Sequence, residues 1–316
     1  MHNCLVGSEM CIRDSYTIKE IYSGMRIDRW IRNNVASLPQ SLIEKSLRKG
    51  KIKVNIKKVN SSYKLKTGDK IKFFNFTFEV KKNKETNKKF SPSSELLKVH
   101  ENRILENNDD FIVIDKSPGV PVQGGTKSKK NLIDILASSE FFKDTKPFPV
   151  HRLDKETSGI MIISKNHNSA RLLTTLFRLR KIHKTYLAVC HGQISKKKGE
   201  LKNELITFEN DKKKIEKAIT YYKVLSETDT TSFLELKPVT GRKHQLRKQL
   251  ALIDNPIVGD KKYILSNKKI KSDKDLMLHA YSLKFYINNK KFFYKVSPPA
   301  AFNKYLNKKK LNILNF

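Results

Sequence analysis

Several common features are missing from this sequence, and each absence narrows what the protein can be. Only three cysteines occur among 316 residues, and their irregular spacing offers neither a disulfide framework nor a Cys-x-x-Cys metal site. No apolar run reaches the roughly 18 residues that a membrane-spanning helix needs, and no basic start with an apolar core marks a signal peptide. Neither a His-Glu-x-x-His zinc motif nor a Gly-x-x-x-x-Gly-Lys phosphate loop is present. We therefore expect a protein of the reducing cytoplasm that has no membrane contact, no metal and no cofactor.

Acidic residues are scarce relative to basic ones. Lys and Arg together number 65, whereas Asp and Glu number 31, and the formal net charge is +34. Such an excess favours a polyanionic partner, most simply nucleic acid. Nucleotide bias is an alternative source of part of this excess, because Lys and Asn are both abundant here and both use A-rich codons.

The first residues differ in character from the rest of the chain. The segment MCIRDS at residues 10–15 is the translation of a DNA sequence that resembles the end of a sequencing transposon. We therefore expect residues 1–15 to be a non-native or disordered tail. The remaining length suits two domains.

A small basic module is expected over residues 16–80. Apolar residues at helical spacing begin at Ile27, and a second amphipathic helix is predicted over residues 41–49. Residues 51–56 then alternate strictly between polar and apolar, and residues 70–73 follow a turn, so both segments are predicted to be strands. The expected order is helix, helix, strand, strand.

Basic residues cluster in the second of these helices and in the strand beside it. They are Lys45, Arg48, Lys49, Lys51 and Lys53. Such a cluster suits phosphate groups, although an ordinary solvated face carries the same pattern. The pattern R-I-D-R-W…S-L-I-E-K-S-L-R-K-G-K-I-K-V-N…L-K-x-G-D resembles the S4 domain, which binds structured RNA. The resemblance implies that these five residues bind RNA.

The sequence beyond this module predicts a linker and a larger domain. Residues 81–98 are polar and have no apolar period, so we expect them to form the linker. Over residues 99–316, short apolar strands and helices alternate without a regular βαβ repeat. This order predicts an α+β domain with a mixed, largely antiparallel sheet and flanking helices.

Three polar clusters joined to short strands are the candidate sites of chemistry in this domain. Asp154 precedes a turn and a strongly apolar run; a carboxylate there can attack an electrophilic carbon, or it can simply cap the turn. Tyr186 lies on a predicted strand, either as a core aromatic or as a stacking face for an unpaired base. Thr240 is expected to cap a helix whose polar face carries His244 and Arg247. That face is either a solvated basic surface or the place where Arg247 meets a buried acid.

Taken in order, the segments HRLDKETSG, KTYLAV-x-HG, TGRKHQLR and NPIVGDKKY resemble the RluA/RluC/RluD family of pseudouridine synthases. FIVIDKSPGV and LHAYSLKF also match, and the resemblance covers about residues 20–300. Members of this family isomerise a uridine within RNA to pseudouridine without a cofactor. The resemblance implies that Asp154 is the catalytic carboxylate, that Tyr186 stacks on the target base and that Arg247 pairs with Asp154. Such an arginine would stabilise the charged, nucleophilic form of the acid.

The resemblance also implies a set of substrate-binding residues, namely His151, Arg152, Arg242, His244 and Leu246. Lys243 and Gln249 depart from residues common in the family, which puts RNA contacts in doubt at these two positions. Cys190 is expected to be a buried small apolar residue and not a reactive thiol.

The S4-like module is similar to that of the C and D types, and LPQSLIEKSLRKGKIKVN is nearer the C type. This implies large-subunit (23S) ribosomal RNA as the substrate. Nothing in the sequence suggests more than a monomer, so we expect a monomeric enzyme. Two alternatives remain: the same chemistry on transfer RNA or another ribosomal position, and a non-catalytic RNA-binding factor of ribosome assembly. The joint presence of Asp154, Tyr186 and Arg247 favours catalysis, because a scaffold has no need of all three.

Overall fold

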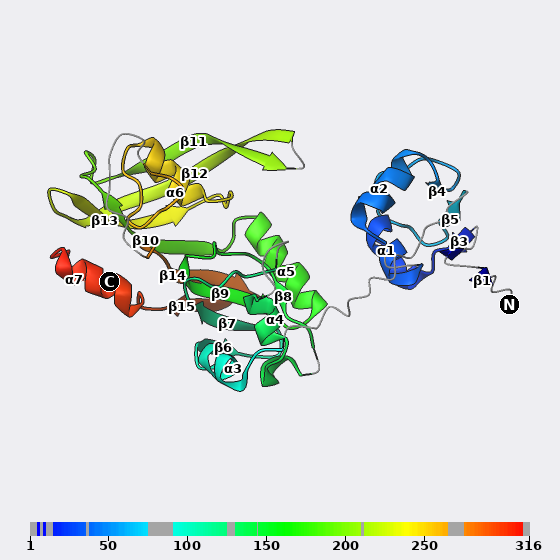
Figure 1. Cartoon of the computed structure of the whole chain (residues 1–316), viewed down its shortest axis with the longest axis horizontal. Coiled ribbons are helices and arrows are strands. Elements are labelled where there is room, and N and C mark those ends of the chain that lie inside the picture. Colours follow the sequence, from blue (N-terminus) through cyan, green and yellow to red (C-terminus); the bar gives the residue numbers. More distant parts are fainter. Residues whose placement is uncertain are drawn as a thin grey trace. The chain divides into compact units, whose positions relative to one another are not determined.

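The chain folds as two compact units, Met1–Asn87 and Lys88–Phe316, in a computed structural model (Figure 1). The boundary between them falls inside the segment 81–98 that was expected to be a linker. The structure describes residues 5–6, 9–10, 15–35, 38–74, 91–124, 130–143, 145–209, 212–264 and 275–311.

The described part of the first unit contains two α-helices, one short 3-10 helix, a three-stranded sheet and a separate pair of strands. Its described elements are β1 (Leu5–Val6), β2 (Glu9–Met10), β3 (Ser15–Thr17), η1 (Glu20–Tyr22), α1 (Ile27–Asn34), α2 (Gln40–Arg48), β4 (Ile52–Val54) and β5 (Lys70–Phe73). β5 lies between β3 and β4 and runs antiparallel to both. Ile27, Ile43 and Ile71 are fully buried where the helices meet the sheet. The predicted order of helix, helix, strand, strand is confirmed from α1 to β5, but strand β3 and the short helix η1, which were not predicted, precede it.

Two boundaries in this unit differ from the expectation. The strand predicted over residues 51–56 ends at Val54, because Asn55 and Ile56 adopt positive φ angles of 49° and 68° and reverse the chain. Ser15, expected in the non-native or disordered tail, pairs with Lys72 in the sheet. Apolar alternation alone did not reveal the turn, since Ile56 continues the pattern although 68% of its surface is exposed.

The second unit is a ten-stranded sheet with helices packed against it. Its described elements are α3 (Ser94–Glu101), β6 (Ile104–Asn107), β7 (Phe111–Lys116), α4 (Leu132–Leu136), η2 (Glu140–Phe142), β8 (Phe148–Pro149), β9 (Ser158–Ser164), α5 (His167–Arg178), β10 (His183–His191), β11 (Lys198–Glu209), β12 (Lys212–Glu227), β13 (Thr231–Pro238), α6 (Gln245–Leu252), β14 (Leu278–Ile287), β15 (Lys290–Lys295) and α7 (Ala300–Lys308). α3 begins inside the expected linker, so the linker prediction is wrong for residues 94–98.

The sheet runs in the order β11-β12-β13-β10-β14-β9-β7-β6, with β15 paired to β14 and β8 to β9 (Figure 1). Every pair is antiparallel except β14 with β9. The prediction of an α+β fold on a mixed, largely antiparallel sheet is therefore confirmed.

The apolar run that follows Asp154 forms β9, the strand that positions the site. All seven of its residues are buried, because the sheet is covered on both faces here. Met161 and Ile163 pack on one face with α4, whereas Ile160 and Ile162 pack on the other face with α5. This alternation follows from the two-residue period of a strand.

Gly159 permits the one parallel contact in the sheet. It has a φ of +109° and lies opposite Ala280 of β14. A Cβ atom at this position would lie 2.2 Å from the backbone oxygen of Ala280, closer than any side chain can approach. Only glycine therefore lets β14 lie directly against the start of β9.

Candidate active site

All the site residues predicted for this unit line one pocket of about 690 Å³. They are His151, Arg152, Asp154, Tyr186, Arg242, His244, Leu246 and Arg247. The pocket forms where the loop before β9, strand β10 and the start of α6 come together. The sheet order brings these segments together, because only one strand, β14, lies between β10 and β9.

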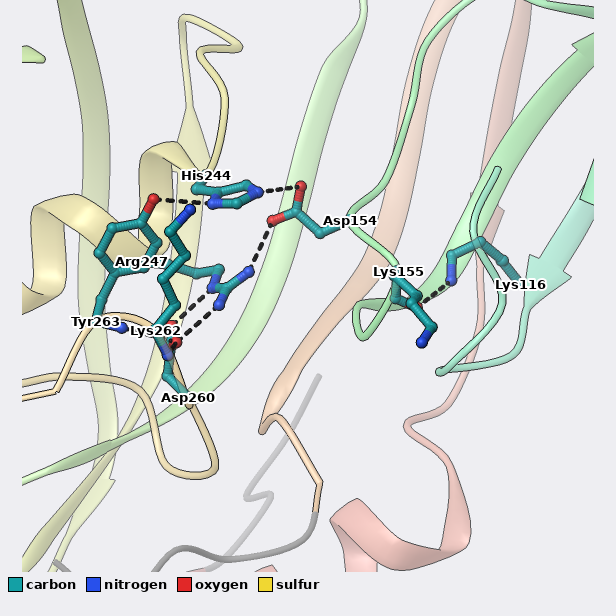
Figure 2. A network of polar contacts seen from close by, with 8 residues as sticks. All are labelled: Lys116, Asp154, Lys155, His244, Arg247, Asp260, Lys262 and Tyr263. Atoms are coloured by element: carbon teal, nitrogen blue, oxygen red, sulfur yellow. Dashed lines mark hydrogen bonds and ion pairs between the residues drawn. The ribbon is translucent and has the colours of Figure 1, made fainter. Parts of the chain in front are cut away.

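Asp154 lies in the loop between β8 and β9, and this loop is fixed by backbone hydrogen bonds. The amide of Thr157 donates to the Asp154 carbonyl at 3.1 Å and closes a turn. The next carbonyl, that of Lys155, accepts from the Gly119 amide at 2.9 Å and from the Lys116 ammonium at 3.0 Å. The Asp154 side chain, 22% exposed, points away from these contacts toward α6 (Figure 2).

Arg247, in the first turn of α6, contacts two carboxylates. Its Nη1 lies 3.5 Å from Asp154 Oδ2, as the family resemblance implied. Its stronger partner is Asp260, whose two oxygens accept from Nε and Nη2 at 2.7 Å each (Figure 2). Such a two-pronged pair fixes the orientation of the guanidinium plane. The side chain of Asp260 has no exposed surface, so Asp260 is the buried acid that holds Arg247 beside Asp154.

The two charges of this buried pair stabilise each other. Burial alone would raise the pKa of Asp260, but hydrogen bonds from Arg247 and from the amides of Lys262 and Tyr263 outweigh it and leave that pKa below its ordinary value. Burial likewise works against the cation, yet the two carboxylates raise the pKa of Arg247 above its ordinary value. Arg247 therefore faces Asp154 as a permanent cation.

His244 lies beside Arg247 and faces the other oxygen of the Asp154 carboxylate. Its Nε2 lies 3.6 Å from Asp154 Oδ1, and its Nδ1 is hydrogen-bonded to the Tyr263 hydroxyl at 2.9 Å (Figure 2). The prediction that His244 lies on the helix is wrong, because it precedes α6 with a left-handed φ of 55°. Thr240 is likewise not the cap. Its hydroxyl accepts from the Ile219 amide and donates to Gln245, and so ties the loop to β12.

Tyr186 and His151 form the apolar part of the pocket. Burial, and then the charge of Asp154, raise the pKa of Tyr186, so its phenol stays protonated. Burial lowers the pKa of His151 to about 3, which keeps its imidazole neutral. His151 Nε2 accepts a hydrogen bond from the Ile162 amide at 2.9 Å, and its ring stacks on Phe177. These contacts favour a positioning role for His151 over direct substrate binding.

Comparison with known proteins agrees with this geometry. The family described as RNA pseudouridylate synthase matches residues 110–252. A protein of Rickettsia conorii named ribosomal large subunit pseudouridine synthase C is 37% identical over 270 residues, covering 82% of this chain and 88% of its own. Proteins with the same name from Rickettsia bellii and Vibrio parahaemolyticus are 36% and 30% identical, covering 90% and 85% of this chain and 96% and 87% of their own. The chain belongs to the pseudouridine synthase family.

A solved structure supports the same assignment. Human RNA pseudouridylate synthase domain containing 4 superimposes with a TM-score of 0.62 at 26% identity, over 70% of this chain and 98% of its own. Membership of the family makes this protein an RNA-modifying isomerase.

The remaining predicted residues of this pseudouridine synthase differ in what they contact. Arg152 is exposed at the pocket, whereas Leu246 is buried in the core beneath it. Arg242 lines the pocket, but its side chain donates to the Glu216 carboxylate at 2.9 Å and to a backbone carbonyl of β12. Gln249 has no exposed surface and bonds to Thr220 and backbone carbonyls. Its departure from the family pattern therefore bears on packing, and the expectation that it affects an RNA contact is wrong.

Sequence reasoning gave no role to four residues that shape the site. Asp260 and Tyr263 stood in the segment NPIVGDKKY, where an acid and an aromatic follow a glycine. Lys116 is fully buried, and its ammonium donates to the carbonyls of Ser117, Val120 and Lys155. Lys184 lines the pocket, and burial lowers its pKa to about 8. The family motifs contained all four, but a motif does not show which atoms meet.

Other expectations concern residues away from the pocket. Cys190 is fully buried in the core of the sheet, as predicted, and burial raises the pKa of its thiol. Within the described residues, no helix is long and apolar enough to cross a membrane. Over the same ranges, no group of three or more His, Cys, Asp or Glu side chains could hold a metal ion.

Four of the five predicted RNA-binding residues of the first unit lie at the C-terminal end of α2. Lys45 and Arg48 belong to its last turn, and Lys49 and Lys51 follow it, all four exposed. Lys53, half-buried on β4, extends its ammonium over the ring of Phe74 at 5.1 Å from the centroid.

Proposed function

We propose that this protein converts specific uridines of large-subunit ribosomal RNA to pseudouridine, with Asp154 as the nucleophile. The observation that carries the proposal is the Asp154 carboxylate lining a pocket in contact with Arg247, in a chain whose relatives are named ribosomal large subunit pseudouridine synthase C. In the reaction the C–N bond between base and ribose breaks, the uracil turns, and a C–C bond forms. Substrate and product are isomers, so the proposed reaction needs no cofactor.

The target uridine must leave its RNA helix to reach Asp154. Unstacking and unpairing a base costs roughly a few kcal/mol, which contacts with the extruded nucleotide and its flanks must offset. The pocket volume of about 690 Å³ falls within the roughly 300–1,000 Å³ of ligand-binding pockets. Tyr186 offers an aromatic face on which the extruded uracil stacks.

Exposed cations around the pocket suit the phosphates on either side of that base. Arg152, Arg178, Arg180 and Lys243 all line the pocket and are exposed. In the first unit, an S4-like domain in this proposal, a second group of cations (Lys45, Arg48, Lys49, Lys51 and Lys53) binds the backbone of structured RNA. Phosphate contacts of this kind position the enzyme, and base contacts in the pocket select uridine.

We also propose that the enzyme acts as a monomer. Its proposed substrate places it in the cytoplasm.

The test uses the full chain, wild type and Asp154→Asn, on unmodified large-subunit ribosomal RNA. Pseudouridines are mapped by carbodiimide adducts and primer extension. Glu156→Gln is the matched control, since it neutralises an exposed carboxylate two residues away in the same loop. We expect new stops with the wild type and Glu156→Gln, and none with Asp154→Asn.

Other outcomes would overturn separate parts of the proposal. Stops produced by Asp154→Asn as well would exclude Asp154 as the nucleophile. Stops on transfer RNA alone would replace the substrate. Tight RNA binding without any stop on either RNA would favour a non-catalytic role in ribosome assembly.

A further inference from the structure

The proposed reaction requires a proton transfer that a nucleophile does not perform. In uridine, C5 carries a hydrogen and N1 is bonded to ribose; in pseudouridine, C5 is bonded to ribose and N1 carries a hydrogen. One proton must therefore leave C5 after the new C–C bond has formed. That step calls for a base which is uncharged near neutral pH and lies within reach of C5.

We propose that His244 is the base that removes the C5 proton, an inference that rests on the proposed function of Asp154. His244 lines the pocket, and its Nε2 lies 3.6 Å from Asp154 Oδ1 (Figure 2). Asp154 can attack C6 of the base or C1′ of the ribose, and in both cases C5 lies close to the Asp154 carboxylate. The reason is that C5 is bonded to C6 throughout the reaction and to C1′ in the product. A base beside the Asp154 carboxylate is thus beside C5 by either route.

Other polar groups of the pocket are unsuited to this step. His151 is neutral, but its Nε2 already accepts a hydrogen bond from a backbone amide of β9, and its pKa of about 3 makes it a poor base. Arg247 keeps its proton at all relevant pH values. The pKa of Tyr186 is raised by burial and by the charge of Asp154, so its phenol is a donor and a poor base. Lys184, with a pKa of about 8, is mainly charged at pH 7.

The surroundings of His244 keep its imidazole neutral before the step and stabilise it afterwards. Burial lowers the pKa of His244, and the charge of Asp154 raises it. The positive charges of Arg247, Lys262 and Lys243 lower it further. The net pKa is below the ordinary 6.5. Once protonated, the ring faces the Asp154 carboxylate on one side, and the Tyr263 hydroxyl contacts the other nitrogen at 2.9 Å.

The backbone provides a second, independent indication. His244 has a φ of 55°, a left-handed conformation that is strained for a residue other than glycine and that persists where the surrounding structure imposes it. This conformation, the bond to Tyr263 and the edge-on contact between their rings together fix the imidazole in the pocket. Strain retained at a pocket residue is typical of sites whose geometry serves the reaction.

The step balances without an oxidant or a co-reactant. The C5–H bond breaks and its proton passes to Nε2 of His244. If Asp154 attacked C1′, the C–H electron pair forms the C5=C6 double bond and the C6=N1 pair becomes a lone pair on N1. If Asp154 attacked C6, the C–H electron pair forms the C5=C6 double bond and expels the Asp154 carboxylate from C6, while N1 keeps the electron pair of the cleaved bond to ribose. That nitrogen then takes a proton from the imidazolium or from water, which returns His244 to its neutral form.

The experiment measures single-turnover pseudouridine formation by the full chain on RNA with hydrogen or deuterium at uridine C5. We expect His244→Gln to reduce the rate by about 10²–10⁴-fold, with RNA affinity within about threefold of wild type. We also expect deuterium to slow the variant several-fold and the wild type little, because C5–H cleavage becomes rate-limiting. In the wild type the rate should rise with pH only at acidic values, where His244 is protonated and C5–H cleavage limits the rate, and the variant should lose this rise. His183→Gln, an exposed histidine at the start of β10, is the matched control.

A second variant guards against misfolding. His244→Gly suits the left-handed backbone and leaves space for a small molecule. We expect added imidazole to restore its rate in a concentration-dependent way. A His244→Gln rate within about threefold of wild type, or a loss of rate with neither an isotope effect nor imidazole rescue, would overturn the inference. Failure of the wild type to form pseudouridine on any RNA would instead overturn the proposed function.

Discussion

Asp260→Asn should separate the buried support of the active site from the groups that touch substrate. The Asp260 carboxylate accepts four hydrogen bonds of 2.7–3.0 Å, two from the Arg247 guanidinium and two from the amides of Lys262 and Tyr263. Asparagine has one oxygen, so its amide nitrogen would face the Nε–H donor of Arg247. The change also removes the negative charge opposite a cation.

The expected loss can be estimated from burial. The Asp260 side chain has no exposed surface and that of Arg247 is 10% exposed, so solvent screens this pair little. Removing one partner of a buried pair typically costs about 3–5 kcal/mol. Because asparagine keeps part of the hydrogen bonding, we expect a loss of about 3 kcal/mol in the free energy of unfolding. Without its pair of hydrogen bonds to Asp260, the Arg247 side chain should be less well positioned beside Asp154. We expect this to reduce turnover by about 10²-fold.

Chemical denaturation and single-turnover rates measure the two effects. Asp254→Asn is the matched control, because Asp254 is exposed, lies in the same segment and has a φ of 61°, which asparagine tolerates. The lowered pKa of Asp260 implies stability that is present above about pH 4 and is lost as pH falls through the folded-state value. The difference between wild type and Asp260→Asn should therefore shrink below pH 4. A variant as stable and as active as Asp254→Asn would refute the idea that Asp260 holds Arg247.

Three further predictions test other parts of the structure. Lys116→Met should lower the free energy of unfolding by about 2–3 kcal/mol, since three partly buried backbone carbonyls lose the hydrogen bond from the Lys116 ammonium. With a folded-state pKa of about 8, below the usual 10.5, Lys116 binds fewer protons than in the unfolded chain between those values. The rise in wild-type stability over this pH range, measured by denaturation, should therefore weaken in the variant. Gly259→Ala should destabilise far more than Gly119→Ala, although both have positive φ. Only the Cβ at Gly259 meets a backbone oxygen, at 1.8 Å; equal melting temperatures would contradict this. Lys45→Glu with Arg48→Glu should weaken RNA binding by at least tenfold and flatten its salt dependence, measured by filter binding; an unchanged slope would place the RNA elsewhere.

Much of the site could be predicted because its residues lie in short, strongly patterned segments. Asp154 precedes a run of apolar residues that can only be a buried strand, and the polar segment around Arg247 runs into a helix. The prediction that Asp154 and Arg247 are in contact came from the resemblance to a family. The periodicity of apolar residues did not indicate it. Spacing along the chain says nothing about which strands become neighbours, and Asp154 and Arg247, 93 positions apart, are separated by several strands.

The details that could not be predicted depend on backbone conformation and on buried partners. Helical spacing placed His244 and Arg247 on one face, but the left-handed backbone at His244 removes it from the helix and turns it toward Asp154. The role of Gln249 was misjudged because a polar residue on an amphipathic helix is ordinarily exposed. Here it bonds to buried groups of β11 and β12 instead. Hydrogen-bond partners far away in the sequence decided both cases.

The position of Asp154 depends on contacts with both halves of the sheet. From one side, the Lys116 ammonium at the end of β7 holds the carbonyl next to Asp154 in the chain. From the other side, α6 and the Asp260 loop, which pack with β10 and β13, present Arg247 to its carboxylate. β14 joins these halves, and its parallel contact with β9 is possible only because Gly159 has no side chain. A residue without any functional group therefore sets the distance between the proposed nucleophile and its cation, and adding one methyl group there should disrupt the site as a whole.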